Sequence, residues 1–76
     1  MTKDEFAQAF ATALNREGIE LWPDSVFSEL DFWDSLCVLM TIAFADEQYG
    51  KALSGRQIAR ARTVSDLHRL LEVSDG

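Results

Sequence analysis

The spacing of apolar positions divides the chain into helices joined by one long connection. Phe6, Phe10 and Leu14 recur every four residues, which predicts an amphipathic helix over residues 4–16. Residues 35–49 are apolar on nearly every side for their first eleven positions. They predict a second helix that either lies at the centre of the core or presents part of its apolar surface to a partner.

Glycine and capping residues mark where these helices begin and end. Gly18 and Gly50 are expected to end the first and second helices, because glycine readily adopts the left-handed conformation that follows a helix. Asp34 is expected to cap the start of the second helix. Two further helices, one short and one longer, are predicted to begin at capping-box pairs: Ser54 with Gln57, and Thr63 with Asp66. The apolar face of the last helix consists of Val64, Leu67, Leu70 and Leu71.

The connection over residues 18–33 is longer than most helix-to-helix links. A short helical turn is expected around residues 25–29. Trp22 and Trp33 are also expected to anchor this connection. Its other apolar side chains should pin it across the helices: Ile19, Leu21, Val26, Phe27 and Leu30.

These elements predict an all-α fold, a small four-helix bundle with three longer helices, one short helix and a long first loop. The chain is expected to form one domain over residues 1–76. One cysteine cannot form an internal disulfide, and Cys and His are too few for a zinc site. No apolar run is long enough to span a membrane and the start is not a signal peptide, so a cytoplasmic location is expected. His68 is interpreted as a surface or boundary residue.

The charge is negative and unevenly distributed. The net charge of −6 disfavours nucleic acid and anionic membranes as partners. Residues 17–34 contain six acidic residues and no basic one, and they end next to Ser35. Such a surface would steer basic partner proteins toward that serine. No nucleophile–base pair, paired catalytic carboxylates or glycine-rich phosphate loop is recognisable, so the chain is not interpreted as an enzyme.

Three segments together resemble the acyl carrier protein family. They are residues 27–36 (Phe-Ser-Glu-Leu-Asp-Phe-Trp-Asp-Ser-Leu), 47–53 (Glu-Gln-Tyr-Gly-Lys-Ala-Leu) and 63–67 (Thr-Val-Ser-Asp-Leu). In that family an Asp-Ser-Leu triplet opens the second helix, an acidic-aromatic-Gly ending follows about a dozen residues later, and Thr-Val-x-Asp-Leu opens the last helix. The resemblance covers roughly residues 6–72.

The resemblance implies that Ser35 carries a covalent 4′-phosphopantetheine arm, whose thiol would hold an acyl group as a thioester. It also implies that Asp34, besides capping the helix, helps a Mg²⁺-dependent phosphopantetheinyl transferase to engage. Enzymes that load and process the acyl group would be further partners. The protein is expected to be a monomer. The partner-binding residues are expected to be Asp31, Trp33, Leu36, Cys37, Met40 and Glu47.

The chain departs from the common fatty-acid carriers around the serine. Phe32 and Trp33 stand where many of them have Gly and a small residue, and Cys37 and Met40 stand where they often have acids. The second helix should therefore offer partners a more apolar face, which fits a discrete carrier of a specialised pathway. Cys37 is interpreted as a small packing residue rather than a reactive thiol. An aminoacyl or peptidyl carrier, and a cofactor-free helical interaction module, remain as alternatives.

Overall fold

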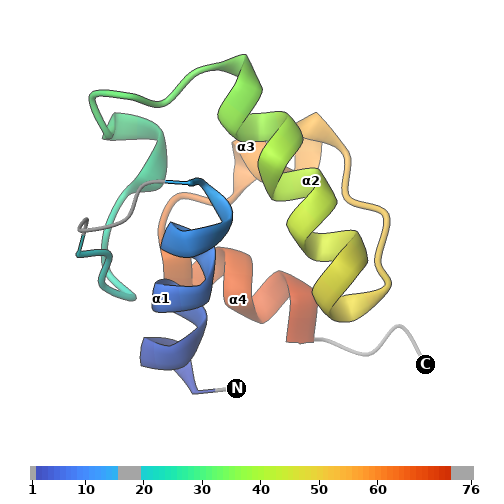
Figure 1. Ribbon diagram of the computed structural model, residues 1–76, viewed down its shortest axis with the longest axis horizontal. Coiled ribbons are helices and arrows are strands. Elements are labelled where there is room, and N and C mark those ends of the chain that lie inside the picture. The colour runs from blue at the N-terminus through green and yellow to red at the C-terminus, as the bar shows by residue number, and fades with distance from the viewer. Residues whose placement is uncertain (1, 16–19, 73–76) are drawn as a thin grey trace.

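The computed structural model describes residues 2–15 and 20–72, and these residues form four α-helices (Figure 1). The elements in chain order are α1 (Lys3–Ala13), a 3₁₀ turn (Phe27–Glu29), α2 (Ser35–Tyr49), α3 (Gly55–Arg60) and α4 (Val64–Glu72). α1 packs against α2 and α4, and α2 also contacts α3. The predicted all-α architecture of three longer helices, one short helix and a long first connection is confirmed. Within the described ranges, no helix is long and apolar enough to cross a membrane.

The predicted capping residues are found at three of the four helix starts and at one helix end. The Asp34 carboxylate accepts a hydrogen bond from the Cys37 N–H at 3.0 Å, and Gly50 adopts the left-handed conformation at φ 64°. Ser54 and Gln57 form the complete capping box of α3. Thr63 and Asp66 exchange the equivalent pair of bonds at the start of α4.

α1 ends earlier than the predicted range of residues 4–16. Thr2 caps the helix in a capping box with Glu5. Ala13 is its last residue, and Asn15 two positions later has a φ of 62°. Asparagine tolerates the left-handed conformation better than most residues, so Asn15 provides the stop expected of a glycine. The predicted stop at Gly18 and the anchor Ile19 lie outside the described residues.

The core is built around the aromatic residues of α1. Phe6 and Phe10 are fully buried, as the four-residue spacing predicted. The Phe6 ring meets Phe44 of α2 edge-on at 5.6 Å between centroids, and Phe10 meets Phe27 of the 3₁₀ turn at 5.9 Å. α4 completes the core with its predicted apolar face: Val64, Leu67 and Leu71 are buried and Leu70 is half-buried.

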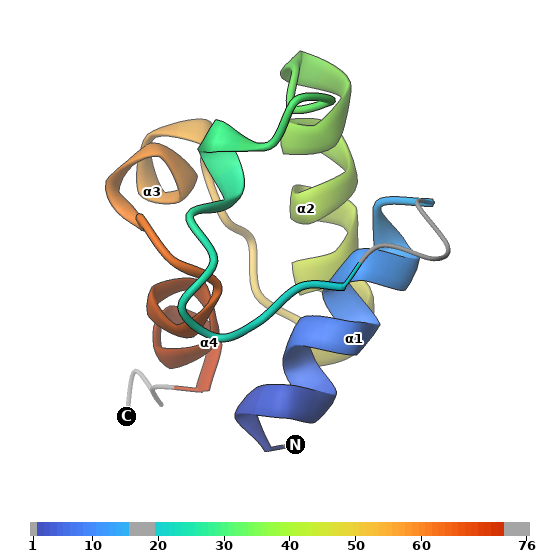
Figure 2. The ribbon, with the colours of Figure 1, turned by 90° about the vertical axis from the view of Figure 1, so that its left-hand side faces the viewer.

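The described part of the long connection, residues 20–33, is fastened to α4 and then leads to the first turn of α2 (Figure 2). The backbone N–H groups of Val64 and Ser65 donate to the carbonyls of Ser25 and Pro23 at 3.0 and 2.8 Å. Leu21 and Phe27 are buried anchors, as predicted. The prediction that Trp22 is also an anchor is wrong, because its side chain is 59% exposed.

Candidate functional site

Ser35 is the first residue of α2 and is exposed. Asp34 before it has extended backbone geometry, and its carboxylate takes up the Cys37 N–H of the first turn. The first amides of a helix have no carbonyl partner within the helix and lie at the positive end of its dipole. An anionic group bonded to the Ser35 oxygen would therefore lie in a favourable electrostatic environment.

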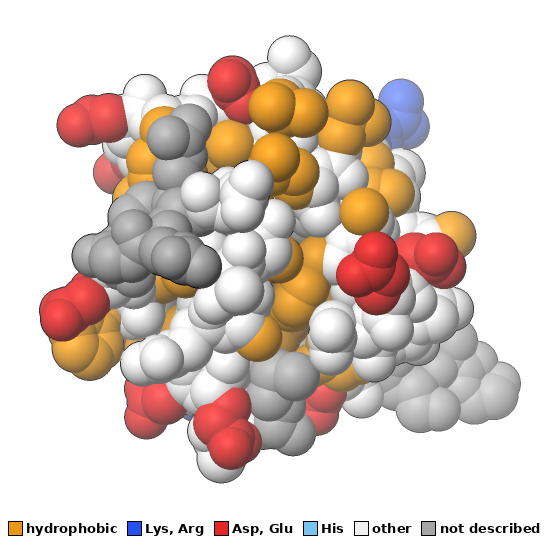
Figure 3. Space-filling view, in the orientation of Figure 1, with side chains coloured by type: hydrophobic (Ala, Val, Ile, Leu, Met, Phe, Trp, Pro, Cys, Tyr) orange, Lys and Arg blue, Asp and Glu red, His pale blue; other side chains and the backbone are white. Residues whose placement is uncertain are grey.

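The surface of α2 beside Ser35 is apolar. Leu36 is 57% and Leu39 is 62% exposed, and Ala43 one turn later is also exposed. These three residues form what we call the outer stripe of α2. Figure 3 shows hydrophobic side chains gathered over the upper part of this helix, with acidic side chains near both of its ends. The predicted partner residue Leu36 thus lies on an accessible surface next to the serine.

The prediction that Cys37 belongs to the exposed face is wrong. Its side chain is only 3% exposed, and its thiol donates to the Phe32 carbonyl at 3.5 Å. Two residues correspond to about 200° of rotation around a helix, so Cys37 points away from the Ser35 side and into the core. Its interpretation as a small packing residue is confirmed. Met40 is half-buried against the core and contributes only part of its side chain to the surface.

The remaining predicted partner residues divide into exposed acids and one aromatic anchor. Asp31 lies in the turn before α2 and Glu47 lies near its C-terminal end, and both are exposed. Trp33 is half-buried, and its ring packs edge-on against Phe27 at 5.0 Å between centroids. Trp33 is therefore confirmed as an anchor of the connection, with part of its surface still accessible two residues before Ser35.

A hollow of about 210 Å³ lies beside this site. Trp33 and Phe27 form one wall, Val38 of α2 another, and the small residues Gly55 and Ala59 of α3 a third. A Cβ atom placed on Gly55 would come within 3.9 Å of Val38 Cγ1, so the missing side chain keeps this space open. Apart from the small residues of α3, no sequence pattern predicted this hollow.

Other candidate groups lie in the core or have no metal-binding arrangement. The His68 ring packs at 4.6 Å from the Phe6 ring, and its Nε2 is 3.8 Å from a Glu72 carboxylate oxygen. This confirms His68 as a boundary residue. Among the described residues, no three His, Cys, Asp or Glu side chains come together in a way that could hold a metal ion.

Comparison with known proteins leaves the family open: no family model, curated protein or solved structure matches the chain. The resemblance to acyl carrier proteins therefore remains a prediction that depends on its three segments. In the structure, residues 27–36 lead into the first turn of α2, residues 47–53 contain its end, and residues 63–67 open α4.

Proposed function

We propose that this chain is a discrete carrier protein that holds an acyl group as a thioester on a 4′-phosphopantetheine arm attached to Ser35. The observation that carries the proposal is an exposed serine on the first turn of α2, capped by Asp34 and bordered by the exposed Leu36 and Leu39. The protein would act in the cytoplasm, in fatty-acid, polyketide or another specialised biosynthesis.

The attachment step requires only an accessible hydroxyl on this chain. Ser35 Oγ attacks the phosphorus of coenzyme A that bears the pantetheine, the P–O bond to the nucleotide breaks, and adenosine 3′,5′-bisphosphate leaves. The serine proton passes to the transferase. The resulting phosphodiester would lie at the N-terminus of α2, where the helix dipole and the first amides favour an anion. The role of Asp34 on this chain is to hold that first turn in place.

The hollow beside Trp33 supports the presence of an arm. Val38 lines it and lies three residues after Ser35, which makes the two residues neighbours on the helix surface. Phe27, Ala59 and Trp33 give it mainly apolar walls. An aliphatic chain attached to Ser35 would bury apolar surface against these walls, which is favourable. A modification that adds only charge would gain nothing from apolar walls.

The outer stripe supports docking by partner enzymes. Leu36 and Leu39 supply apolar contact area, and the exposed acids Asp31 and Glu47 lie beyond its two ends. Such an arrangement fits basic surfaces with an apolar centre, because charge steers the encounter and burial of the apolar side chains holds the complex. The expected partners are a phosphopantetheinyl transferase and the enzymes that load and process the acyl group.

The proposal is tested by incubating the apo protein with coenzyme A, Mg²⁺ and a broad-specificity phosphopantetheinyl transferase, followed by intact-mass measurement. A gain of one phosphopantetheine unit is expected for the wild type and for Ser28→Ala, a matched control at another exposed serine. No gain is expected for Ser35→Ala. If several transferases leave the wild-type mass unchanged, the carrier proposal is wrong.

The exposed outer stripe also supports a second candidate, a cofactor-free module that binds a partner helix through Leu36 and Leu39. The same mass measurement separates the two candidates, because such a module gains no arm. An aminoacyl or peptidyl carrier would gain the arm, and it is distinguished by testing which adenylating or acyl-transferring enzyme loads the thiol.

A further inference from the structure

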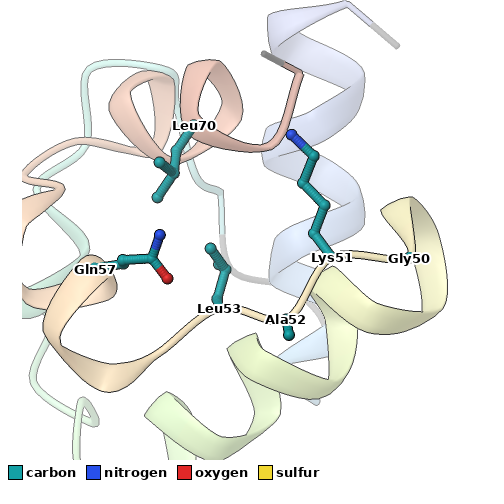
Figure 4. Close-up of a pocket in the computed structure, with 6 residues that line it drawn as sticks. All are labelled: Gly50, Lys51, Ala52, Leu53, Gln57 and Leu70. Carbon is teal, nitrogen blue, oxygen red and sulfur yellow. The ribbon is translucent and has the colours of Figure 1, made fainter. Parts of the chain in front are cut away.

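α3 lies beside the N-terminal half of α2. The connection over residues 50–54 leads back along α2 to α3, and Figure 4 shows its Leu53 pointing toward Leu70 of α4. Leu53 is buried, which fastens the connection. A Cβ atom placed on Gly55, the first residue of α3, would come within 3.9 Å of Val38 Cγ1 of α2. The exposed side chains of α3 are therefore close to the N-terminal half of the outer stripe.

The charges beside the two halves of the outer stripe have opposite signs. Arg56 and Arg60 of α3 are exposed and four residues apart, so they are neighbours on the helix surface and repel each other. Neither has an ion-pair partner among the described residues. At the C-terminal end of α2, Asp46 and Glu47 are exposed. Figure 3 shows a basic side chain beside the upper part of α2 and acidic side chains beside its lower part.

Such a surface is complementary to itself. When two copies pack their outer stripes together with the α2 helices antiparallel, the N-terminal half of each helix meets the C-terminal half of the other. We propose that this chain forms a symmetric dimer of this kind. Arg56 and Arg60 of each copy then face Asp46 of the other, and the two outer stripes form the apolar centre.

The dimer is expected to be transient. Each outer stripe has only three residues, which supply less apolar area than a stable dimer buries. Two copies with a net charge of −6 also repel each other, although at physiological ionic strength this repulsion is screened beyond about 8 Å. We expect a Kd of about 0.1–1 mM, so that the monomer predominates at low concentration. The dimer covers the stripe when no partner is docked there, and it does not depend on an arm at Ser35.

The test measures the weight-average mass of the unmodified protein by sedimentation equilibrium, at physiological ionic strength and over concentrations that span this Kd. The mass should rise from that of a monomer toward that of a dimer. Leu39→Ala should weaken dimerisation at least about tenfold, because symmetry removes two side chains from the interface. Trp22→Ala is the matched control, since it removes a similarly exposed apolar side chain outside the stripe and should dimerise like the wild type.

A charge exchange tests the pairing across the interface. Arg56→Glu combined with Arg60→Glu should abolish dimerisation, and Asp46→Arg should do the same from the other side. An equimolar mixture of these two variants should dimerise with about the wild-type Kd, because every contact in the mixed dimer again joins opposite charges. Lys3→Glu changes the charge at an exposed position of α1 and should have no effect. All of these positions are exposed, and circular dichroism checks that each variant is folded.

Three outcomes would overturn the proposal. A monomer at every concentration would leave the outer stripe to a different partner. Dimerisation that is lost in Trp22→Ala and retained in Leu39→Ala would place the contact on the long connection instead. A wild type that dimerises, with a mixture of the two charge variants that does not, would show that the arginines of α3 do not face Asp46.

Discussion

The two sides of α2 have nearly the same chemistry and opposite environments. On the outer stripe, Leu36 and Leu39 are more than half exposed. On the inner side, Cys37 and Phe44 are almost completely buried. Every one of these four side chains is apolar, so hydrophobicity alone does not decide which side faces the core. What decides it is packing, since the aromatic residues of α1 cover only one side of α2.

α2 therefore has more apolar surface than the rest of the domain covers. If α2 served only to fill the core, polar residues on the outer stripe would make the protein more soluble without removing any buried side chain. The inner side should therefore determine stability, and the outer stripe should matter for partners. Substitutions on the two sides separate these roles.

The largest expected effect is on folding, from a truncation on the inner side. Phe44→Ala should lower the free energy of unfolding by about 3–5 kcal/mol, because it removes a buried ring packed against Phe6 and Phe10. Leu39→Ala on the outer stripe should change it by no more than about 0.5 kcal/mol. Both are measured by chemical denaturation. Equal losses for the two variants would mean that the outer stripe is packed in solution.

The next effect concerns the reactivity of a thiol on each side. Cys37 should react with an aromatic disulfide reagent at least about a hundredfold more slowly than a cysteine placed at Ala43 in the Cys37→Ala background. A buried thiol reacts only after local opening, whereas Ala43 is exposed. Reaction rates are followed by absorbance of the released thiolate. Similar rates at both positions would contradict the burial of Cys37.

These two sides also mark where prediction from sequence succeeds and where it stops. Helix boundaries at Asp34 and Gly50 were predictable, because a cap depends on a few neighbouring residues. The exposure of Cys37 was predicted wrongly, since it depends on which side α1 covers. The prediction for Trp22 was wrong for a related reason. Its backbone N–H donates to Ser25 Oγ at 2.9 Å, in a turn that is hydrogen-bonded to α4, and this turn leaves the indole ring exposed to solvent.

The candidate sites divide in the same way. Ser35 could be singled out from a local pattern, and its exposure follows from its place on the first turn. The hollow beside Trp33 could not, because it depends on residues distant in sequence. Trp33 of the long connection and Ala59 of α3 both line it.

A smaller effect is expected at the cap, where the two sides of α2 begin. Asp34→Ala should lower the free energy of unfolding by about 1 kcal/mol, because the Cys37 N–H loses its acceptor. Asp34→Asn retains an oxygen acceptor and should cost much less. Thermal denaturation of the three proteins measures the difference. If the Asn variant lost as much as the Ala variant, the carboxylate charge would matter more than the hydrogen bond.

An effect that is absent at neutral pH is expected at the other end of α2 and appears only at alkaline pH. Burial of the Tyr49 hydroxyl, followed by the nearby Glu72 carboxylate, raises the pKa of Tyr49 from its usual value of 10.0 to about 12. Tyr49 is the only tyrosine in the chain, so phenolate absorbance reports its ionisation directly. Glu72→Gln should lower this pKa without returning it to the usual value, because burial is the larger cause.

The same shift predicts how stability depends on pH. Between pH 10 and about 12 the unfolded chain releases the Tyr49 proton while the folded protein retains it. The unfolded state therefore binds fewer protons, and the free energy of unfolding should fall as pH rises through this interval. Tyr49→Phe removes this contribution and should lose stability less steeply over the same interval. Identical slopes for the two proteins would mean that the Tyr49 hydroxyl is solvated, and that the inner side of α2 ends before its last residue.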